Sequence, residues 1–298
     1  MTRQITRRGF AVLAGGFLVS TRAAAETEMP LLTRAIPSSG ERIPAVGLGT
    51  AYVFNTNNEA TRGKADAVVQ ALIKSGGRLI DTASTYGDAE SVLGEVTAAA
   101  GLRDKLFIAT KLESPDPEEL KRSLARLKTA SVDLLQLHNV RDTQQSLQRF
   151  REWKQQGVCR YVGITSTFRR DYPAIEAVLK REKPDFVQID YSIDNREAEK
   201  TILPLAVEVG AGVLTALPYG RARLFRAVHG KELPDWAQVF ANSWGQFFLK
   251  YLLGDPRVTA VIPGTDNPGH MTDNADTMHG PLPDAGQRRR MVEFIEAL

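Results

Sequence analysis

Eight short, continuously apolar segments follow one another along this chain from residue 43 onward, and longer stretches with helical spacing separate them. Their brevity, their β-branched content and their lack of polar alternation predict strands that are buried on both faces. The segments cover residues 43–49, 78–82, 106–111, 132–138, 160–165, 185–191, 212–217 and 258–263. A sheet of eight parallel strands is therefore expected.

The intervening stretches are long enough to form crossover helices. Residues 65–74 repeat apolar side chains at helical spacing and end before Gly76, and a second helix is expected after Asp88. Residues 118–128 place acids in the first turn and cations later, as the helix dipole favours. The repeated alternation of strand and helix predicts an α/β fold of the (β/α)8, or TIM-barrel, type.

Two further features concern the ends and boundaries of this barrel. Residues 31–43 contain a Ser-Ser-Gly turn and predict a β-hairpin that plugs the amino-terminal end of the barrel. No internal repeat or low-complexity linker divides residues 30–298, so a single domain is expected. The less regular stretches 55–62 and 219–236 follow strands and are candidates for substrate or cofactor contacts, although residues 55–62 fit an ordinary surface loop equally well.

The first 25 residues have the order of an export signal. Arg7 and Arg8, followed by Phe10, an apolar run over residues 11–19 and three alanines ending at Ala25, match a removable twin-arginine (Tat) signal. The alternative is a membrane-anchoring helix, but spanning needs roughly 20 apolar residues and this run is shorter. The twin-arginine export machinery is thus an expected partner, and the expected location of the mature protein is the periplasm.

The remaining composition is that of a folded protein, because 43% of the 298 residues are hydrophobic and 24% are charged. Removing residues 1–25, which carry four arginines and no acid, would change the formal net charge from +3 to −1. Neither a nucleic-acid partner nor stable membrane insertion is expected, and Arg288, Arg289 and Arg290 fit a solvated helix face. The single cysteine, Cys159, excludes an intramolecular disulfide and fits a packed hydrophobic residue better than a reactive thiol. No metal site is predicted.

Four polar side chains that could form one catalytic site follow consecutive strands. Asp81, Lys111 and His138 end the second, third and fourth apolar segments, and Tyr86 lies five residues beyond Asp81. In a barrel of this type the carboxyl ends of the strands face the active site. A lysine held charged by an aspartate lowers the pKa of a neighbouring phenol, which can then deliver a proton, and an imidazole can donate a hydrogen bond to a carbonyl. Taken singly, each residue fits a cap, a salt bridge or a structural histidine, but their joint placement favours carbonyl reduction.

With these residues the chain resembles the aldo-keto reductase family. The resemblance runs in family order from about residue 33 to 275, and it rests on Gly47-Leu-Gly-Thr50, Asp81 with Tyr86-Gly87, Glu90-Ser-Val-Leu-Gly94, Lys111, Val132-Asp-Leu-Leu-Gln-Leu-His138, Gly163-Ile-Thr-Ser166, Gln188, Pro218, Ile262-Pro-Gly-Thr265 and Asn274. It implies that Tyr86 is the general acid, that Lys111 and Asp81 tune it, and that His138 orients the substrate carbonyl. It also implies a nicotinamide dinucleotide that lies extended across the carboxyl face of the barrel.

The resemblance further implies a set of cofactor contacts, with NADP(H) favoured and NAD(H) possible. The implied contacts are Gly49, Thr50, Thr165, Ser166, Gln188, Leu217, Pro218, Tyr219, Gly220, Arg221, Pro263, Gly264, Thr265, His270, Asp273 and Asn274. No Gly-x-Gly-x-x-Gly motif follows a strand, as expected when no Rossmann fold is used.

Several positions depart from the family pattern. The usual Ser-Asn pair after the fifth strand is Thr165-Ser166, and Ala216 replaces the tyrosine that stacks on the nicotinamide. The cations that often bind the 2′-phosphate near Gly264 and His270 are absent, and Asp266 would oppose a phosphate there. The usual tryptophan after the first strand is replaced by Ala51-Tyr52. Residues that could rebuild the pocket wall, although each also fits ordinary packing, are Tyr52, Phe54, Trp236 and Trp244.

The leading hypothesis is a monomeric NAD(P)H-dependent oxidoreductase that reduces a small aldehyde or ketone to an alcohol. Two alternatives remain. Lys111 could form a Schiff base with a carbonyl substrate, which would require a lowered pKa that Asp81 opposes. A non-catalytic redox sensor or regulatory protein that binds the nicotinamide cofactor on the same barrel would explain the departures at Ala216 and at the first strand.

Overall fold

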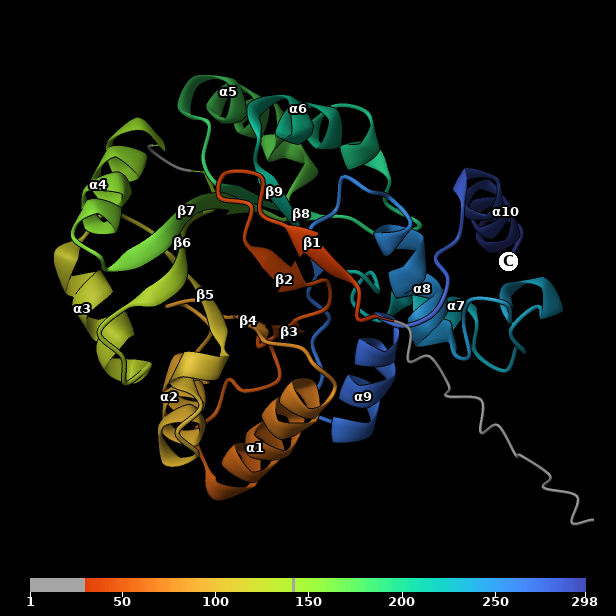
Figure 1. The fold of residues 1–298 in the computed structure, drawn as a ribbon, viewed down its shortest axis with the longest axis horizontal. Coiled ribbons are helices and arrows are strands. Elements are labelled where there is room, and N and C mark those ends of the chain that lie inside the picture. The colour runs from red at the N-terminus through yellow and green to blue at the C-terminus, as the bar shows by residue number, and fades with distance from the viewer. Residues whose placement is uncertain (1–29, 141–142) are drawn as a thin grey trace, which may run out of the picture.

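A closed barrel of parallel strands forms the centre of the protein, whose computed structural model describes residues 30–140 and 143–298 (Figure 1). Its sheet has the order β10-β9-β8-β7-β6-β5-β4-β3, and all neighbouring strands pair in parallel. Parallel bridges from Val46 to Val261 and from Gly49 to Gly264 join the two edge strands. The strands are β3 (Leu48–Gly49), β4 (Leu79–Asp81), β5 (Phe107–Leu112), β6 (Val132–His138), β7 (Cys159–Ser166), β8 (Phe186–Asp190), β9 (Gly212–Ala216) and β10 (Ala260–Val261). The predicted (β/α)8 barrel is confirmed.

Helices surround the barrel as a ring in the view of Figure 1. They are α1 (Glu59–Lys74), α2 (Ala89–Ala99), α3 (Pro117–Arg126), α4 (Thr143–Gln155), α5 (Tyr172–Glu182), α6 (Ile202–Val209), α7 (Arg223–Ala227), α8 (Trp244–Leu253), α9 (Pro268–Asp276) and α10 (Ala285–Glu296). Short 3-10 helices cover Arg103–Lys105, Arg169–Asp171, Glu197–Glu199 and Asp235–Ala237. Among the described residues no helix is both long and apolar enough to cross a membrane.

Alternate residues of each strand point into the barrel, because the side-chain period of a strand is two. The inward positions at the amino-terminal half carry a buried apolar layer in which the rings of Phe107, Tyr161 and Phe186 pack at centroid distances of 5.6–6.2 Å, one pair stacked and two pairs edge to face. Following the same alternation toward the carboxyl ends of the strands places Asp81 and Lys111 inside the barrel as well. The fold therefore separates an apolar floor from a polar mouth.

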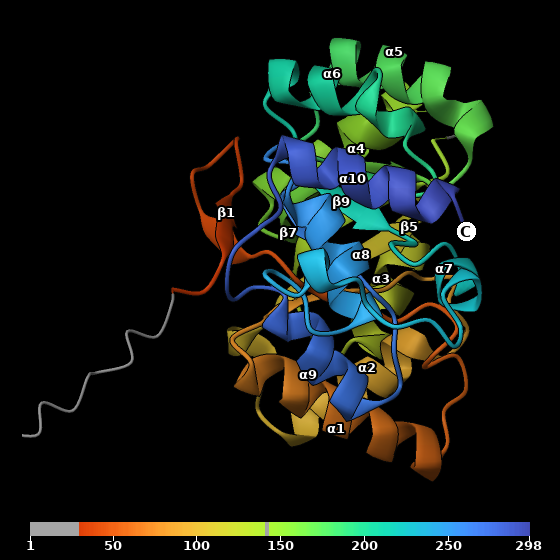
Figure 2. The same ribbon diagram turned by 90° about the vertical axis from the view of Figure 1, so that its right-hand side faces the viewer.

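The hairpin of β1 (Thr33–Ala35) and β2 (Arg42–Pro44) closes the amino-terminal end, as predicted. Its turn uses Gly40 with a φ of 76°, and Ile36 and Ile43 are fully buried in the apolar layer of the barrel. Figure 2 shows the hairpin at one end of the molecule and α7, which follows β9, at the opposite end. The open end of the barrel is thus the one at which the strands terminate.

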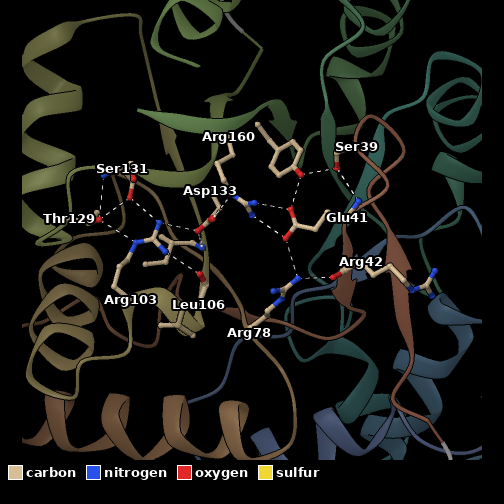
Figure 3. A network of polar contacts seen from close by, with 12 residues as sticks. Ser39, Glu41, Arg42, Arg78, Arg103, Leu106, Thr129, Ser131, Asp133 and Arg160 are labelled. Atoms are coloured by element: carbon tan, nitrogen blue, oxygen red, sulfur yellow. Dashed lines mark hydrogen bonds and ion pairs between the residues drawn. The ribbon is translucent and has the colours of Figure 1, made fainter. Parts of the chain in front are cut away.

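A polar network joins the hairpin to the strand beginnings (Figure 3). Glu41 of the hairpin pairs with Arg78 and Arg160, and Asp133 pairs with Arg160 and Arg103. A pocket of about 430 Å³ opens beside it, and these three arginines line the pocket. The three arginines form ion pairs with Glu41 and Asp133. Because the amino-terminal end of a barrel contributes to stability more than to catalysis, we assign the network a structural role.

Some predicted boundaries are wrong, for local reasons. Helix α1 begins at Glu59 rather than at residue 65, because the side chain of Asn58 caps it by accepting the N–H of Thr61, so part of the predicted loop 55–62 is helical. The first apolar run splits between β2 and β3. Arg288 is not solvated, because its guanidinium bonds to Glu199 and packs on the ring of Tyr251.

The single cysteine is a packed core residue. Cys159 is buried, and burial raises the pKa of its thiol to about 12, which confirms that it is a packed residue. The predicted twin-arginine signal over residues 1–25 lies outside the described residues.

Candidate active site

A buried ion pair lies at the centre of the polar mouth. The ammonium of Lys111, at the end of β5, donates to Asp81 Oδ2 at 2.6 Å and to the carbonyl of Thr82 at 2.7 Å. Burial is the largest single influence on the pKa of Lys111 and lowers it. The Asp81 carboxylate and the Tyr86 phenol together outweigh burial, so the pKa lies above its ordinary value. The Lys111 side chain is therefore a charged ammonium. A Schiff base needs a neutral amine, so this charge opposes the Schiff-base alternative.

The second oxygen of Asp81 accepts hydrogen bonds from two glutamines inside the polar mouth of the barrel. Gln188 Nε2 donates to Oδ1 at 2.8 Å, and Gln136 Nε2 donates to the same atom at 3.3 Å. The carbonyl oxygen of Gln188 in turn accepts the hydroxyl of Thr165 at 2.9 Å. The predicted nicotinamide contacts Gln188 and Thr165 thus belong to the network that orients Asp81, and each keeps part of its hydrogen-bonding capacity for a bound molecule.

Tyr86 lies on the loop after β4, above the ion pair. Its ring centroid is 4.9 Å from Lys111 Nζ. The chain turns sharply at the next residue, Gly87, which has a φ of 56°. A Cβ at Gly87 would lie 2.6 Å from the carbonyl oxygen of Asn55, so the turn requires glycine. Burial raises the pKa of the phenol, and the charge of Lys111 opposes this rise. The phenol therefore holds its proton in the free protein, as a general acid must.

His138 ends β6 beside Tyr86, and the two rings meet edge to face at a centroid distance of 5.9 Å. Burial, followed by the nearby charge of Lys111, lowers the pKa of the imidazole to about 4. Its Nδ1 lies 2.5 Å from Glu113 Oε1 and 3.4 Å from the hydroxyl of Thr85. The structure thus brings the four predicted catalytic residues together and adds a carboxylate to them.

The remaining predicted cofactor contacts lie on β3 and β7, on the loop after β9, and on the segment from β10 into α9. Ala216 and Gly264 occupy inward positions at the mouth and are at least partly exposed, so neither position contributes a large side chain there. Gly49 and Gly264 lie backbone to backbone, with Pro263 accepting the N–H of Gly49, and the buried Thr50 Oγ1 has no protein partner. Small residues with an unpartnered hydroxyl beside them fit a bound planar ring with polar substituents.

The loop after β9 turns through left-handed backbone. Leu217, Gly220 and Arg221 have φ values of 53°, 56° and 54°, and the side chain of Arg221 is exposed. Pro218 is buried, and the Tyr219 hydroxyl lies 2.5 Å from Asn274 Oδ1, which fastens the loop to α9. An exposed cation on a tightly held loop fits a diphosphate.

Helix α9 uses several of the predicted contacts for its own structure. Asn267 caps it by accepting the N–H groups of Gly269 and His270, and Thr265 Oγ1 accepts the N–H of Asn267. Asp273 accepts hydrogen bonds from Ser243 and Gln246. The imidazole of His270 is exposed at the beginning of the helix. Similarly, Ser166 donates to Asp171 at 2.6 Å and accepts the N–H of Phe168.

The aromatic residues named for the pocket wall divide into two groups. Phe54 is fully buried, and Trp236 and Trp244 pack against Phe247 and its aromatic neighbours. Tyr52 is 76% exposed, has a φ of 68° and lies close enough to Tyr86 to influence its pKa. Of the four, Tyr52 alone remains a candidate for the substrate wall.

Sequence reasoning missed three residues of the site: Glu113, Gln136 and Lys64. Gln136 lies two residues before His138 on the same strand, so the alternation that points His138 inward was a signal that could have identified it. Lys64 of α1 lies 2.7 Å from Asp266 Oδ2, across 202 residues of sequence, and no local pattern indicates that pair. Among the described residues no group of three or more histidine, cysteine or acidic side chains could hold a metal ion.

A parallel barrel with an acid, a lysine, a phenol and an imidazole at its carboxyl end defines the class of barrel oxidoreductases. The sequence profile of the Aldo/keto reductase family matches residues 45–289. The chain belongs to this family, whose members are NAD(P)H-dependent oxidoreductases.

Individual relatives agree with this assignment. An uncharacterized oxidoreductase, YqkF, of Bacillus subtilis is 28% identical over 89% of this chain and 94% of its own length. An aldo-keto reductase of Mycolicibacterium paratuberculosis is 31% identical over 78% of this chain and 80% of its own. The crystal structure of an aldo-keto reductase from Klebsiella pneumoniae in complex with NADPH shares the fold, with a TM-score of 0.74, 24% identity, and coverage of 90% of this chain and 96% of that one.

Proposed function

We propose that this protein reduces a small aldehyde or ketone to an alcohol and that Tyr86 donates the proton. The observation that carries the proposal is the position of the phenol over Lys111, whose charge is held by Asp81 at 2.6 Å. A phenol kept protonated by burial can donate only when negative charge develops on the carbonyl oxygen. Lys111 then stabilises the phenolate that remains, and it does so without losing its own proton.

We propose NADP(H) as the cofactor, with NAD(H) as the alternative. The reduced nicotinamide, when bound, supplies the hydride that the carbonyl carbon receives. Gln188, Thr165 and the small residues of the mouth would hold its ring, and Arg221 would face its diphosphate. The Klebsiella relative of the same fold is in complex with NADPH, which supports this choice.

The test is Tyr86→Phe. We expect the substitution to lower kcat for aldehyde reduction by roughly 10²- to 10⁴-fold, the usual contribution of a positioned acid, and to leave the Kd for NADPH within about twofold. Tyr161→Phe is the matched control, because it removes a hydroxyl at the opposite end of the barrel, where it bonds to Glu41. Full turnover by Tyr86→Phe would disprove the acid assignment.

The same measurements separate the enzyme from a redox sensor. A sensor would bind NADPH, detected by fluorescence titration, but would show no multiple turnover with any member of an aldehyde panel. Turnover by the wild type that disappears in Tyr86→Phe supports the enzyme, because a sensor needs no proton donor.

We also propose that the protein is exported to the periplasm as a folded monomer through the twin-arginine route. Arg7 and Arg8 precede the apolar run of residues 11–19, and folding requires no disulfide because Cys159 is the sole cysteine. Replacing both arginines by lysine should retain the full-length chain in the cytoplasmic fraction. Continued appearance of the shortened chain in the periplasmic fraction would contradict the proposal.

A further inference from the structure

His138 holds one of its two ring nitrogens against a carboxylate. The distance from Nδ1 to Glu113 Oε1 is 2.5 Å, and the two side chains are 16% and 35% exposed. Two lone pairs would repel each other at this distance, so a proton must lie between the atoms. The nitrogen available to a substrate is therefore Nε2.

The fold itself places Glu113 there. Strands β5 and β6 pair Lys111 with Gln136 and Leu112 with Leu137, so the next position of that register sets Glu113 beside His138. The N–H of Glu113 donates to Glu119 Oε1 at 3.0 Å, which fixes the backbone at the strand end.

The carboxylate of Glu113 is also held from the side of β6. Asn139 follows His138 with a φ of 65°, a conformation that asparagine tolerates well, and its amide nitrogen lies 3.4 Å from both carboxylate oxygens. The contact between Glu113 and His138 thus has supports on both of the strands that carry it.

Charges around the imidazole determine how many protons the pair carries. Burial and the charge of Lys111 lower the pKa of His138, so at neutral pH the ring has one proton. Because Glu113 needs that proton at Nδ1, Nε2 is then bare and cannot donate. The titratable groups that face the ring are Lys111 on β5, Asp81 on β4, Tyr86 on the loop after β4, Glu119 on α3 and Glu113 itself, and the hydroxyl of Thr85 lies 3.4 Å from Nδ1.

We propose that Glu113 is a positioning residue that sets which nitrogen of His138 carries the proton, so that His138 donates to a substrate carbonyl only when the pair holds two protons. This inference rests on the proposed carbonyl reduction. When the pair holds one proton, Nδ1–H donates to the Glu113 carboxylate, and Nε2 can only accept a hydrogen bond. With two protons, one bridges Nδ1 and Glu113, and the second is on Nε2, where it can polarise a carbonyl.

The pair therefore couples the direction of the reaction to pH. Carbonyl reduction needs the donor form and should fall as pH rises, whereas a bare Nε2 can accept the hydroxyl of an alcohol and suits oxidation at higher pH. Glu113→Gln breaks this coupling. Asn139 continues to require an oxygen acceptor, so the new amide presents its N–H groups to Nδ1 and leaves the proton of the neutral ring on Nε2.

The direct test is ¹⁵N NMR of the imidazole rings in the whole protein, which has four histidines. His138→Asn assigns the resonance. At pH 8 we expect the Nδ1–H tautomer in the wild type, the Nε2–H tautomer in Glu113→Gln, and a weakened Nδ1–H population in Glu113→Ala. Glu118→Gln is the matched control, because it removes a carboxylate that lies exposed on α3 and pairs with Lys121 at 3.8 Å. An unchanged tautomer in both Glu113 variants would overturn the proposal.

The kinetic test follows kcat/KM for aldehyde reduction from pH 5.5 to pH 9 at saturating NADPH. We expect a fall of about tenfold or more in the wild type and in Glu118→Gln, and a change of less than about threefold in Glu113→Gln. Identical profiles in the wild type and Glu113→Gln would overturn the role of Glu113. Failure of the wild type to reduce any aldehyde would instead refute the proposed function, and the tautomer measurement would still decide the role of Glu113.

Discussion

Lys111 and Asp81 form an ion pair of 2.6 Å in which the side chains are only 1% and 5% exposed. Removing two charges from water is costly, and the arrangement is stable because Asp81 keeps both oxygens bonded, one to the ammonium and the other to Gln188 and Gln136. Because burial of the two charges offsets much of their attraction, the pair is weak evidence for stability, and we predict that its main role is in the proposed proton transfer.

Asp81→Asn should leave the Lys111 ammonium buried without a carboxylate. We expect the free energy of unfolding to fall by about 3–5 kcal/mol, and kcat for aldehyde reduction to fall because the lysine loses part of its charge. Urea unfolding followed by circular dichroism measures the first effect. Glu152→Gln is the control: it breaks a half-exposed pair with Arg149 and should cost less than about 1 kcal/mol. Equal losses in both variants would contradict the role given to the buried pair.

Two glycines in helices allow a matched test of packing. Gly94 of α2 lies against α3, and a Cβ there would meet the carbonyl oxygen of Arg126 at 2.1 Å, whereas a Cβ at Gly63 of α1 would meet nothing within 4 Å. Gly94→Ala should lower the free energy of unfolding by about 1–3 kcal/mol, because the helices must separate. Gly63→Ala should raise it by up to about 1 kcal/mol, because alanine is the better helix former. A stabilised Gly94→Ala protein would show that α3 moves freely.

The barrel, and the placement of Asp81, Lys111 and His138 at one end of it, were predictable because both depend on local periodicity. Continuous apolar runs indicate buried strands, and alternation along β4, β5 and β6 points Asp81, Lys111 and His138 to one side. The division of the first run between β2 and β3 was not predictable, since apolar residues look alike whether they pair in a hairpin or in the barrel.

Contacts between elements that lie far apart in the sequence were also not predictable. The pairing of Glu113 with His138 depends on the register of β5 against β6, and the pairing of Lys64 with Asp266 depends on how α1 packs beside α9. Both β5 and β6 are buried along almost their whole length, so neither has the alternation of buried and exposed residues that would specify its register against its neighbour. Helix α1, in contrast, could have been placed correctly, because Asn58 followed by Glu59 is a recognisable helix start.

Lys250 gives a pH dependence of stability that can be measured. Burial lowers the pKa of its ammonium to about 8, and the group donates to the carbonyls of His279 and Pro281 with no carboxylate among its bonds. Between pH 8 and the ordinary value of 10.5, the unfolded chain binds more protons at this site than the folded chain, so the free energy of unfolding rises with pH.

The measurement compares the wild type with Lys250→Met by urea unfolding from pH 7 to pH 10.5. Across that pH range the free energy of unfolding of the wild type should rise by about 3 kcal/mol relative to that of the variant, which has no titrating group at this position. Since all other groups titrate in both proteins, they cancel in the difference. A difference that stays constant with pH would show that Lys250 has its ordinary pKa.

Lys64 and Asp266 should set the preference between NADPH and NADH. The resemblance to other family members puts the 2′-phosphate after the last strand, near Gly264 and His270, where this chain has no arginine or lysine of its own. Lys64 reaches that place from α1, but its Nζ is 2.7 Å from Asp266 Oδ2, and the two side chains are 59% and 47% exposed. The carboxylate of Asp266 therefore competes with a phosphate for the ammonium of Lys64.

Asp266→Asn should release Lys64 and remove the repulsion, so the Kd for NADPH should fall by roughly three- to tenfold while the Kd for NADH stays the same. Lys64→Gln should raise the Kd for NADPH by a similar factor and leave the Kd for NADH unchanged. Fluorescence titration of each variant with both nucleotides measures the two constants directly. Lys74→Gln makes the same charge change at the far end of α1, where the side chain is exposed, and should alter neither constant. If Lys64→Gln and Lys74→Gln bind NADPH equally well, Lys64 does not face the 2′-phosphate.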